Sequence, residues 1–171
     1  MIHLNIGSNL NSNFGNKFKN ISIAINLLAE SKVKIKKISN FYISPSYPNK
    51  NLPKFANIGA LVECKFDQLE LFKKVKLIEK KIGRVKSKNN DPRVCDIDII
   101  DFKGLITKTK ILQLPHLRCH LRNFVLYPIK EIDPKWQHPI LRKNIDILIN
   151  NLTQNSRIEI TRLKKSVIIK I

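Results

Sequence analysis

Apolar residues between Ile2 and Phe102 repeat with two different periods, and the order of these periods constrains the fold more than any other feature of the sequence. Some segments alternate as strands do, and others have the three-to-four-residue spacing of helices. The expected elements are a strand over 2–7, a helix over 16–31, strands over 33–41 and 55–63, a helix over 67–82 and a strand over 95–101. This order predicts an α+β ferredoxin-like sandwich, an antiparallel sheet with helices packed on one face.

Local signals support these boundaries. Asp67 and Glu70 match a capping box at the start of the second helix, and Gly83 stands where glycine commonly follows a helix. The stretch 44–53 contains three prolines, which continue neither a helix nor a strand. It therefore predicts a long loop, and loops of this length often carry function.

The chain of 171 residues is about the size of one domain. We expect residues 1–155 to form a functional domain and residues 156–171 to form a C-terminal extension that packs on it or trails from it. Within the less regular second half, the pattern predicts helices over 121–127 and 144–152. Ile158, Ile160, Val167 and Ile169 indicate extended structure in the tail.

Charge is the strongest bias in the composition. The sequence contains 32 Lys and Arg residues but only 13 Asp and Glu residues, which gives a net charge of +19. Such a field favours an anionic partner, which could be a nucleotide, a nucleic acid or a membrane surface. The sequence shows no signal peptide and no run of membrane-spanning length. We therefore expect a soluble, cytoplasmic protein.

The three cysteines are odd in number and widely spaced, which excludes a disulfide framework or a paired-cysteine zinc motif. His116, Cys119 and His120 are close in sequence and could form part of a metal site. They lack an evident fourth ligand, so a structural zinc site is not favoured.

Two carboxylates in the strand over 95–101 are the first candidates for a functional site. Side chains alternate across a strand, so Asp96 and Asp98 should emerge on one face and Ile97 and Ile99 on the other. The offset of Asp101 predicts that it points away from the acidic pair. Two neighbouring carboxylates repel each other unless a basic side chain or a hard cation such as Mg²⁺ lies between them. The alternative is a solvated polar face without a ligand.

A basic loop leads directly into this strand and carries Arg84, Lys86, Lys88 and Arg93. Carboxylates that hold a metal and cations that neutralise phosphate are what polyphosphate transfer requires. For Lys86 and Lys88 a role as solvated surface charges is favoured, whereas Pro92 restricts the chain beside Arg93. The sequence has no phosphate-binding glycine loop, so side chains and metal would have to hold a nucleotide.

Seven short motifs follow one another along the chain. They are Ile6-Gly7-Ser8-Asn9-Leu10, Ser39–Pro45, Phe55-Ala56-Asn57, Ile78–Val85, Pro92–Ile99, Pro115-His116 and Arg122–Leu126. Each motif is common alone, but their joint order and spacing are specific. From Leu4 to about Pro139 the chain closely resembles the hydroxymethyldihydropterin pyrophosphokinase family of folate biosynthesis.

The resemblance implies transfer of the β,γ-pyrophosphoryl unit of ATP to the hydroxymethyl group of a dihydropterin, with release of AMP. It implies two Mg²⁺ ions held by Asp96 and Asp98, which act in catalysis with Arg84 and Arg93. Residues implied on the ATP side are Glu79, Arg84, Arg93, Ile99, His116 and Arg122. Residues implied on the pterin side are Ser44, Pro45, Tyr47, Phe55, Asn57, Asp96 and Phe124. For Glu79 a structural role is an equal alternative.

The resemblance also implies a monomer whose partners are ATP and a dihydropterin, with no nucleic acid and no membrane. The sequence departs from the family pattern in the loop before Pro92, which is about one residue shorter and lacks the family's tryptophan.

One rival function is that of a basic RNA-binding module on the same fold, which would carry aromatic and basic residues on its central strands. A second rival is a pseudoenzyme retained for a partner interaction.

Overall fold

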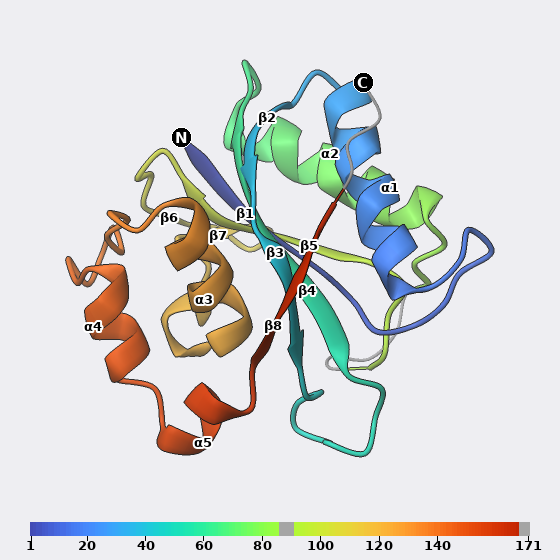
Figure 1. The fold of residues 1–171 in the computed structure, drawn as a ribbon. Helices are drawn as coiled ribbons and strands as arrows, with labels where there is room; N and C mark the ends of the chain where they lie inside the picture. The colour runs from blue at the N-terminus through green and yellow to red at the C-terminus, as the bar shows by residue number, and fades with distance from the viewer. Residues whose placement is uncertain (86–90, 168–171) are drawn as a thin grey trace.

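The structure, a computed structural model, describes residues 1–85 and 91–167. Its centre is an antiparallel sheet with the strand order β5-β1-β4-β3-β8, in which β2 also pairs with β4 (Figure 1). The strands of this sheet are β1 (Ile2–Ser8), β2 (Lys34–Ile38), β3 (Asn40–Ser44), β4 (Phe55–Glu63), β5 (Asp96–Phe102) and β8 (Thr161–Ser166). A separate two-stranded sheet consists of β6 (Thr107–Lys108) and β7 (Gln113–Leu114).

Two long helices, α1 (Lys17–Glu30) and α2 (Gln68–Lys81), cover one face of the sheet, which confirms the predicted ferredoxin-like α+β sandwich (Figure 1). A third helix, α3 (Asn123–Ile132), adds cover on part of the opposite face. The shorter helices are η1 (Cys119–Leu121), α4 (Ile145–Asn150) and α5 (Gln154–Ile158). No helix in the described ranges is long and apolar enough to cross a membrane.

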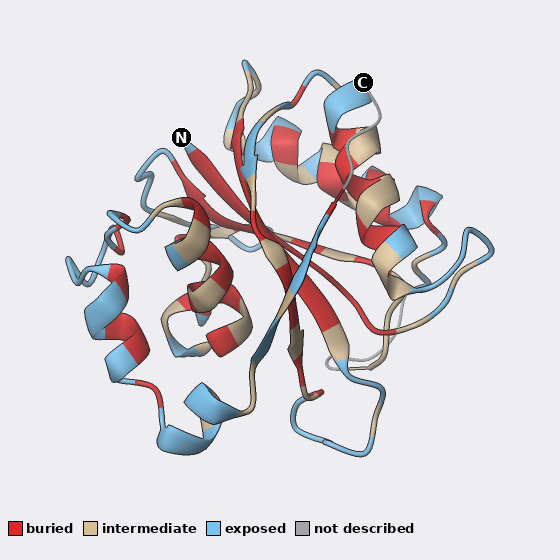
Figure 2. Cartoon of the chain, viewed as in Figure 1, coloured by how far each residue is buried: buried red, intermediate tan, exposed pale blue. Residues whose placement is uncertain are grey.

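Strand β1 is buried along its whole length, as Figure 2 shows. Ile2, Leu4 and Ile6 are fully buried in the main core, which they share with apolar residues of α1 and α2. Burial of each such side chain contributes roughly 1.5–3 kcal/mol. Because side chains alternate, Asn5 and Gly7 lie on the opposite face. Strand β1 therefore anchors the core with one face and presents polar and small residues on the other.

The ends of the two long helices are formed as the sequence predicts. Asp67 accepts hydrogen bonds from the backbone N–H groups of Leu69 and Glu70, and the Glu70 carboxylate accepts one from the Asp67 N–H. Gly83 follows α2 with a φ of 103°, a left-handed conformation that favours glycine. The predicted capping box and helix stop are thus confirmed.

Helix α3 differs from its prediction, because it begins at Asn123 and continues through Pro128 to Ile132. Its apolar face packs against α4 and around Trp136 in a second core cluster. The close approach of α3 to the sheet is allowed by Gly59, where an added Cβ would lie 3.0 Å from Pro128 Cβ. Tertiary packing therefore extends this helix beyond the proline at which the sequence pattern appeared to end it.

Asp101 lies on the same face as Asp98, so the prediction that it points the other way is wrong. A β-bulge shifts the register of β5 against β1, pairing Leu4 with Ile99 but His3 with Asp101. The extra residue, Ile100, reverses the alternation beyond it. Asp101 accepts a hydrogen bond of 2.8 Å from Trp136 Nε1 and has a structural role.

The C-terminal residues complete the edge of the sheet. Strand β8 pairs with β3, and Val167 is buried in the main core. Glu131 of α3 accepts hydrogen bonds from Arg162 of β8 and from Asn40 and Tyr42 of β3. Burial alone would raise the pKa of Glu131, but these hydrogen bonds outweigh burial and lower the pKa to about 2. The extended structure predicted for the tail is found at 161–166, whereas Ile158 lies in α5 and Ile169 lies outside the described residues.

Replacing Asp67 with alanine should destabilise the protein by about 1 kcal/mol, because two backbone donors at the start of α2 lose their acceptor. Asparagine at the same position keeps an acceptor and should cost less than about 0.5 kcal/mol. Urea denaturation of the wild type and both variants measures the difference. Equal losses for alanine and asparagine would contradict the role of the cap.

Candidate active site

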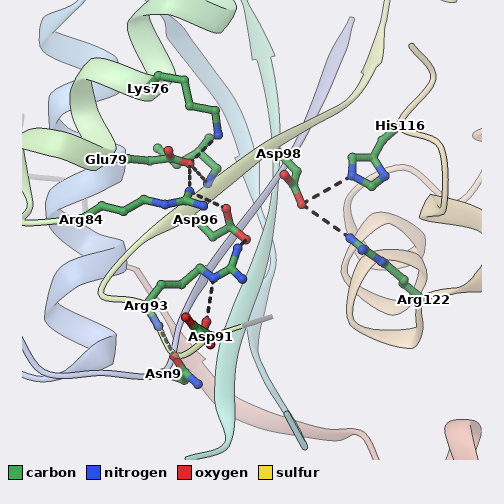
Figure 3. A network of polar contacts seen from close by, with 11 residues as sticks. Asn9, Lys76, Glu79, Arg84, Asp91, Arg93, Asp96, Asp98, His116 and Arg122 are labelled. Carbon is green, nitrogen blue, oxygen red and sulfur yellow. Dashed lines mark hydrogen bonds and ion pairs between the residues drawn. The ribbon is translucent and has the colours of Figure 1, made fainter. Parts of the chain in front are cut away.

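The acidic pair lies on one face of β5, as the sequence predicts (Figure 3). In register, Asp96 lies opposite Gly7 of β1, and Asp98 lies opposite Asn5. Both carboxylates are 23 % exposed. Burial, and secondarily the negative charge of Asp96, raise the pKa of Asp98. This strand face therefore concentrates negative charge where a cation would relieve the repulsion.

Asp96 is held by two arginines that approach it from different segments. Arg84 Nη1 lies 2.6 Å from Asp96 Oδ1, and Arg93 Nη1 donates to Asp96 Oδ2 at 2.9 Å. Burial opposes the charge of Arg84, but Asp96 and Glu79 outweigh it and raise the pKa of this guanidinium. Figure 3 shows both guanidinium groups pointing at Asp96. Two cations thus converge beside the acidic pair.

Glu79 lies on α2 and contacts both Arg84 and the backbone of β5. It is buried on α2, where it accepts hydrogen bonds from the Ile97 N–H at 2.7 Å and from Lys76 Nζ at 2.9 Å. Its carboxylate also lies 2.6 Å from Arg84 Nη1. Burial raises the pKa of Glu79 despite these partners. Glu79 links helix α2 to strand β5 and orients Arg84.

Asp98 points to a different pair of basic groups (Figure 3). His116 Nε2 and Arg122 Nη1 lie 3.9 Å and 3.8 Å from its carboxylate, distances longer than a hydrogen bond. Burial lowers the pKa of His116. The guanidinium of Arg122 also lies over the ring of Phe124, 5.5 Å from its centre. Asp98 therefore lies beyond hydrogen-bond distance of both basic groups, and its side chain lines the cavity described below.

Asn9 joins the two loops that border the site. Its side-chain oxygen accepts the Arg93 N–H at 2.7 Å, and its own N–H donates to the Arg93 carbonyl at 3.1 Å. Its amide nitrogen donates to Ser46 Oγ and to the carbonyl of Pro53. Asn9 belongs to the first of the seven sequence motifs, but only the fold brings it to both loops.

A cavity of about 500 Å³ opens in front of the acidic pair. The predicted residues that line it are Pro45, Tyr47, Phe55, Asn57, Arg93, Asp96, Asp98, Arg122 and Phe124. Its floor requires a glycine at position 7, because an added Cβ there would lie 2.7 Å from Asn57 Oδ1. Acidic, basic and aromatic side chains predicted from separate motifs are thus gathered around one cavity.

The remaining predicted residues lie behind this lining. Ser44 Oγ accepts a hydrogen bond of 3.1 Å from Asn57 Nδ2 and so orients that side chain. Arg84, Glu79 and His116 contact the acidic pair or its supports, as described above. Ile99 is buried in the main core, so any contact with a nucleotide falls to its backbone. The predicted basic residues Lys86 and Lys88 lie outside the described residues.

One wall of the cavity comes from a part of the chain to which the sequence assigned no role. The residues that line the cavity without having been predicted are Asn5, Ser46, Lys50, Arg118, Leu121, Asn123, Thr153, Asn155, Ser156 and Glu159. Asn123 Nδ2 donates to the Ser156 carbonyl at 2.6 Å, and Lys50 forms an ion pair with Glu159. The partners in each pair are distant in sequence, so only the tertiary structure shows that they are in contact.

Cys119 and His120 group with His138, and not with His116 as considered from the sequence. The three possible ligand atoms lie within 4.8 Å of one another. However, His138 Nδ1 accepts the backbone N–H groups of Ile140 and Leu141, each at 3.2 Å, which leaves the proton on Nε2. A protonated nitrogen cannot bind a metal, so this cluster fits a structural turn better than a zinc site.

Comparison with known proteins gives one consistent family. The family model of 7,8-dihydro-6-hydroxymethylpterin-pyrophosphokinase (HPPK) matches residues 3–134. The chain is 36% identical over 142 residues to the 2-amino-4-hydroxy-6-hydroxymethyldihydropteridine pyrophosphokinase of Aquifex aeolicus, covering 83% of this chain and 86% of that protein. It is also 36% identical over 158 residues to the folic acid synthesis protein FOL1 of Dictyostelium discoideum, covering 92% of this chain.

The Dictyostelium protein is much longer, and the chain spans only 23% of it. The fold is similar to that of Plasmodium falciparum HPPK-DHPS in its crystal structure, with a TM-score of 0.65 and 17% identity over 87% of this chain and 44% of that one. The family model thus matches more than half of the chain, and the Aquifex relative is covered over most of its length. The chain belongs to the 7,8-dihydro-6-hydroxymethylpterin-pyrophosphokinase family.

Proposed function

We propose that the protein transfers the β,γ-pyrophosphoryl unit of ATP to the hydroxymethyl group of 6-hydroxymethyl-7,8-dihydropterin, giving AMP and the dihydropterin diphosphate for folate biosynthesis. One observation carries the proposal: the acidic pair Asp96 and Asp98 shares a cavity with three arginines and two phenylalanines. Family membership supports the reaction type and the pterin substrate. The same cavity can accommodate a polyphosphate at its charged end and a flat heterocycle at its aromatic end.

The residues fit a divalent cation. Asp96 and Asp98 offer hard oxygen ligands from one strand face, which is the donor type that Mg²⁺ prefers. The raised pKa of Asp98, caused by burial and by the charge of Asp96, indicates repulsion that a bound cation would offset. Asp96 and Asp98 would hold two Mg²⁺ ions, whose charge would offset that of the phosphate oxygens. We propose Asp96 and Asp98 as the protein ligands of both ions.

The surrounding cations would orient the triphosphate. Asn9 holds the backbone of Arg93, and Arg93 lines the cavity, so the N–H groups of its guanidinium that do not bind Asp91 or Asp96 can bind phosphate oxygens. Arg122 lines the cavity beside Asp98, and His116 and Arg84 lie behind the acidic pair. Phosphoryl transfer depends mainly on such positioning and charge neutralisation. We infer that the substrate hydroxyl attacks the β-phosphorus directly, without a covalent enzyme intermediate.

The pterin would occupy the aromatic end of the cavity. Phe55 and Phe124 both line it and can stack on a flat heterocycle from opposite elements. Asn57, oriented by Ser44, offers a carboxamide to the ring edge, and Pro45 and Tyr47 border the opening. Thr153, Asn155, Ser156 and Glu159 also line the cavity and would border the bound substrates.

The alternative reading as an RNA-binding module has no support from the family match. It also requires a basic surface on the sheet, whereas β5 presents Asp96 and Asp98 on the face that lines the cavity. A monomer, a cytoplasmic location and the division into 1–155 and 156–171 stay predictions.

Replacing Asp96 or Asp98 with asparagine should lower AMP formation at least about a thousandfold, because the metal loses a charged ligand. Asparagine has the same shape, and at position 98 it removes one of two repelling charges, so the thermal stability of Asp98→Asn should not fall. Asp96→Asn also weakens the ion pairs with Arg84 and Arg93 and should be less stable than Asp98→Asn. Asp146, whose carboxylate pairs with Lys130 on the surface, provides the matched control Asp146→Asn. Wild-type rates in either active-site variant would refute the metal assignment.

Removal of divalent cations with EDTA should abolish turnover, and excess Mg²⁺ should restore it. The reaction is followed by chromatographic separation of AMP, ADP and ATP after incubation with hydroxymethyldihydropterin. AMP is expected as the nucleotide product, because the cleaved bond is at the β-phosphorus of the transferred unit. Formation of ADP, or full activity in EDTA, would exclude the proposed reaction.

Replacing Phe124 with alanine should raise the KM for the pterin about tenfold or more, since stacking and apolar burial are lost together. The KM for ATP should change less than the KM for the pterin, because, in the part of the chain that the structure describes, the only contact of Phe124 with the proposed phosphate-binding cations is that of its ring with Arg122. Phe14→Ala is the control, since Phe14 is exposed and does not line the cavity. An equal change in both KM values would argue against the pterin role of Phe124.

A further inference from the structure

Asn5 is a buried polar residue at the base of the cavity whose side-chain oxygen has no hydrogen-bond partner among the described residues. Only 4% of the residue is exposed. Buried carboxamide oxygens normally accept a hydrogen bond, and leaving one without a partner destabilises a protein. The unpaired oxygen therefore indicates a donor that arrives with a ligand.

The neighbours of Asn5 show where that donor would be. In the sheet, Asn5 lies between Gly59 of β4 and Asp98 of β5. Helix α3 closes the side of Gly59, because Pro128 and Ile132 lie against it. The other side opens toward Asp98, whose nearest basic groups, on His116 and Arg122, are 3.8–3.9 Å away. A ligand atom held at Asp98 would therefore lie beside the Asn5 carboxamide.

The chemistry of the acceptor identifies the class of donor. A metal-bound water coordinates the cation through its oxygen, so both of its O–H groups are free to donate hydrogen bonds. The acceptors are often carboxamide or carboxylate groups that do not themselves bind the metal. A substrate hydroxyl directed at the same point would donate in the same way. Rotation of the carboxamide about its last side-chain bond turns its oxygen to either donor.

We propose that Asn5 is a positioning residue that accepts a hydrogen bond from an O–H group held at Asp98. This O–H belongs either to a water on the cation or to the hydroxymethyl group of the pterin. The inference rests on the proposed function, because that function supplies both donors. It assigns a hydrogen bond to β1, whose Gly7 also forms part of the cavity floor.

The first test measures thermal unfolding without ligands. Asn5→Ala removes an unsatisfied buried acceptor and should raise the Tm by about 2–4 °C. Asn20 is the matched control, because it is equally buried but donates to the Leu10 carbonyl and accepts from Ser12 Oγ. Asn20→Ala should lower the Tm. A fall in Tm for Asn5→Ala similar to that of the control would overturn the proposal.

The second test measures binding by calorimetry, which does not depend on turnover. For Mg²⁺ binding in the presence of α,β-methylene-ATP, loss of a water contact should raise the Kd about tenfold in Asn5→Ala. For the pterin, loss of a hydroxyl contact should weaken binding of 6-hydroxymethylpterin but not of 6-methylpterin. Either change supports the proposal and identifies the donor.

If the wild type binds both ligands and Asn5→Ala changes neither the Kd for Mg²⁺ nor the Kd for the pterin, the proposal for Asn5 is wrong. If the wild type itself binds neither Mg²⁺ with the nucleotide analogue nor the pterin, the proposed function fails and this inference fails with it. The two failures are therefore distinguishable from the wild-type titration alone. Asn20→Ala, measured in the same titrations, should bind both ligands as the wild type does.

Discussion

Electrostatic repulsion between Asp96 and Asp98 is the constraint around which the site is arranged. Two carboxylates on one strand face, partly buried, are tolerated because cations approach from several segments. Arg84 and Arg93 bind Asp96 closely, whereas His116 and Arg122 remain farther from Asp98. The asymmetry leaves one carboxylate anchored and the other available to a ligand.

Strand β1 makes this arrangement compatible with a stable fold. One of its faces buries Ile2, Leu4 and Ile6 in the main core, while the other carries Asn5 and Gly7 beneath the cavity. The same backbone thus belongs to the most buried part of the protein and to the floor of the site. A rigid floor of this kind helps to hold charged groups in place without rearrangement when a ligand binds.

Several predictions from the sequence were correct because they depend on neighbouring residues. The capping box at Asp67, the glycine after α2 and the alternation of Asp96 with Ile97 all express local backbone geometry. Asp101 was misplaced because a bulge at Ile100 depends on pairing with β1, which local alternation does not encode. Helix α3 was placed too early and too short because its packing against the sheet outweighs the break expected at Pro128.

The sequence by itself determined the order of helices and strands, the acidic pair with its basic loop, and the motifs that indicate the family. These features are set by periodicity, by backbone preferences and by residue types at short spacing. Only the tertiary structure decided which side chains share the cavity, that residues 153–159 form its wall, and that the oxygen of Asn5 lacks a partner. The physical reason is that contacts and burial depend on strand register and on distant segments meeting in space, which short-range patterns do not specify.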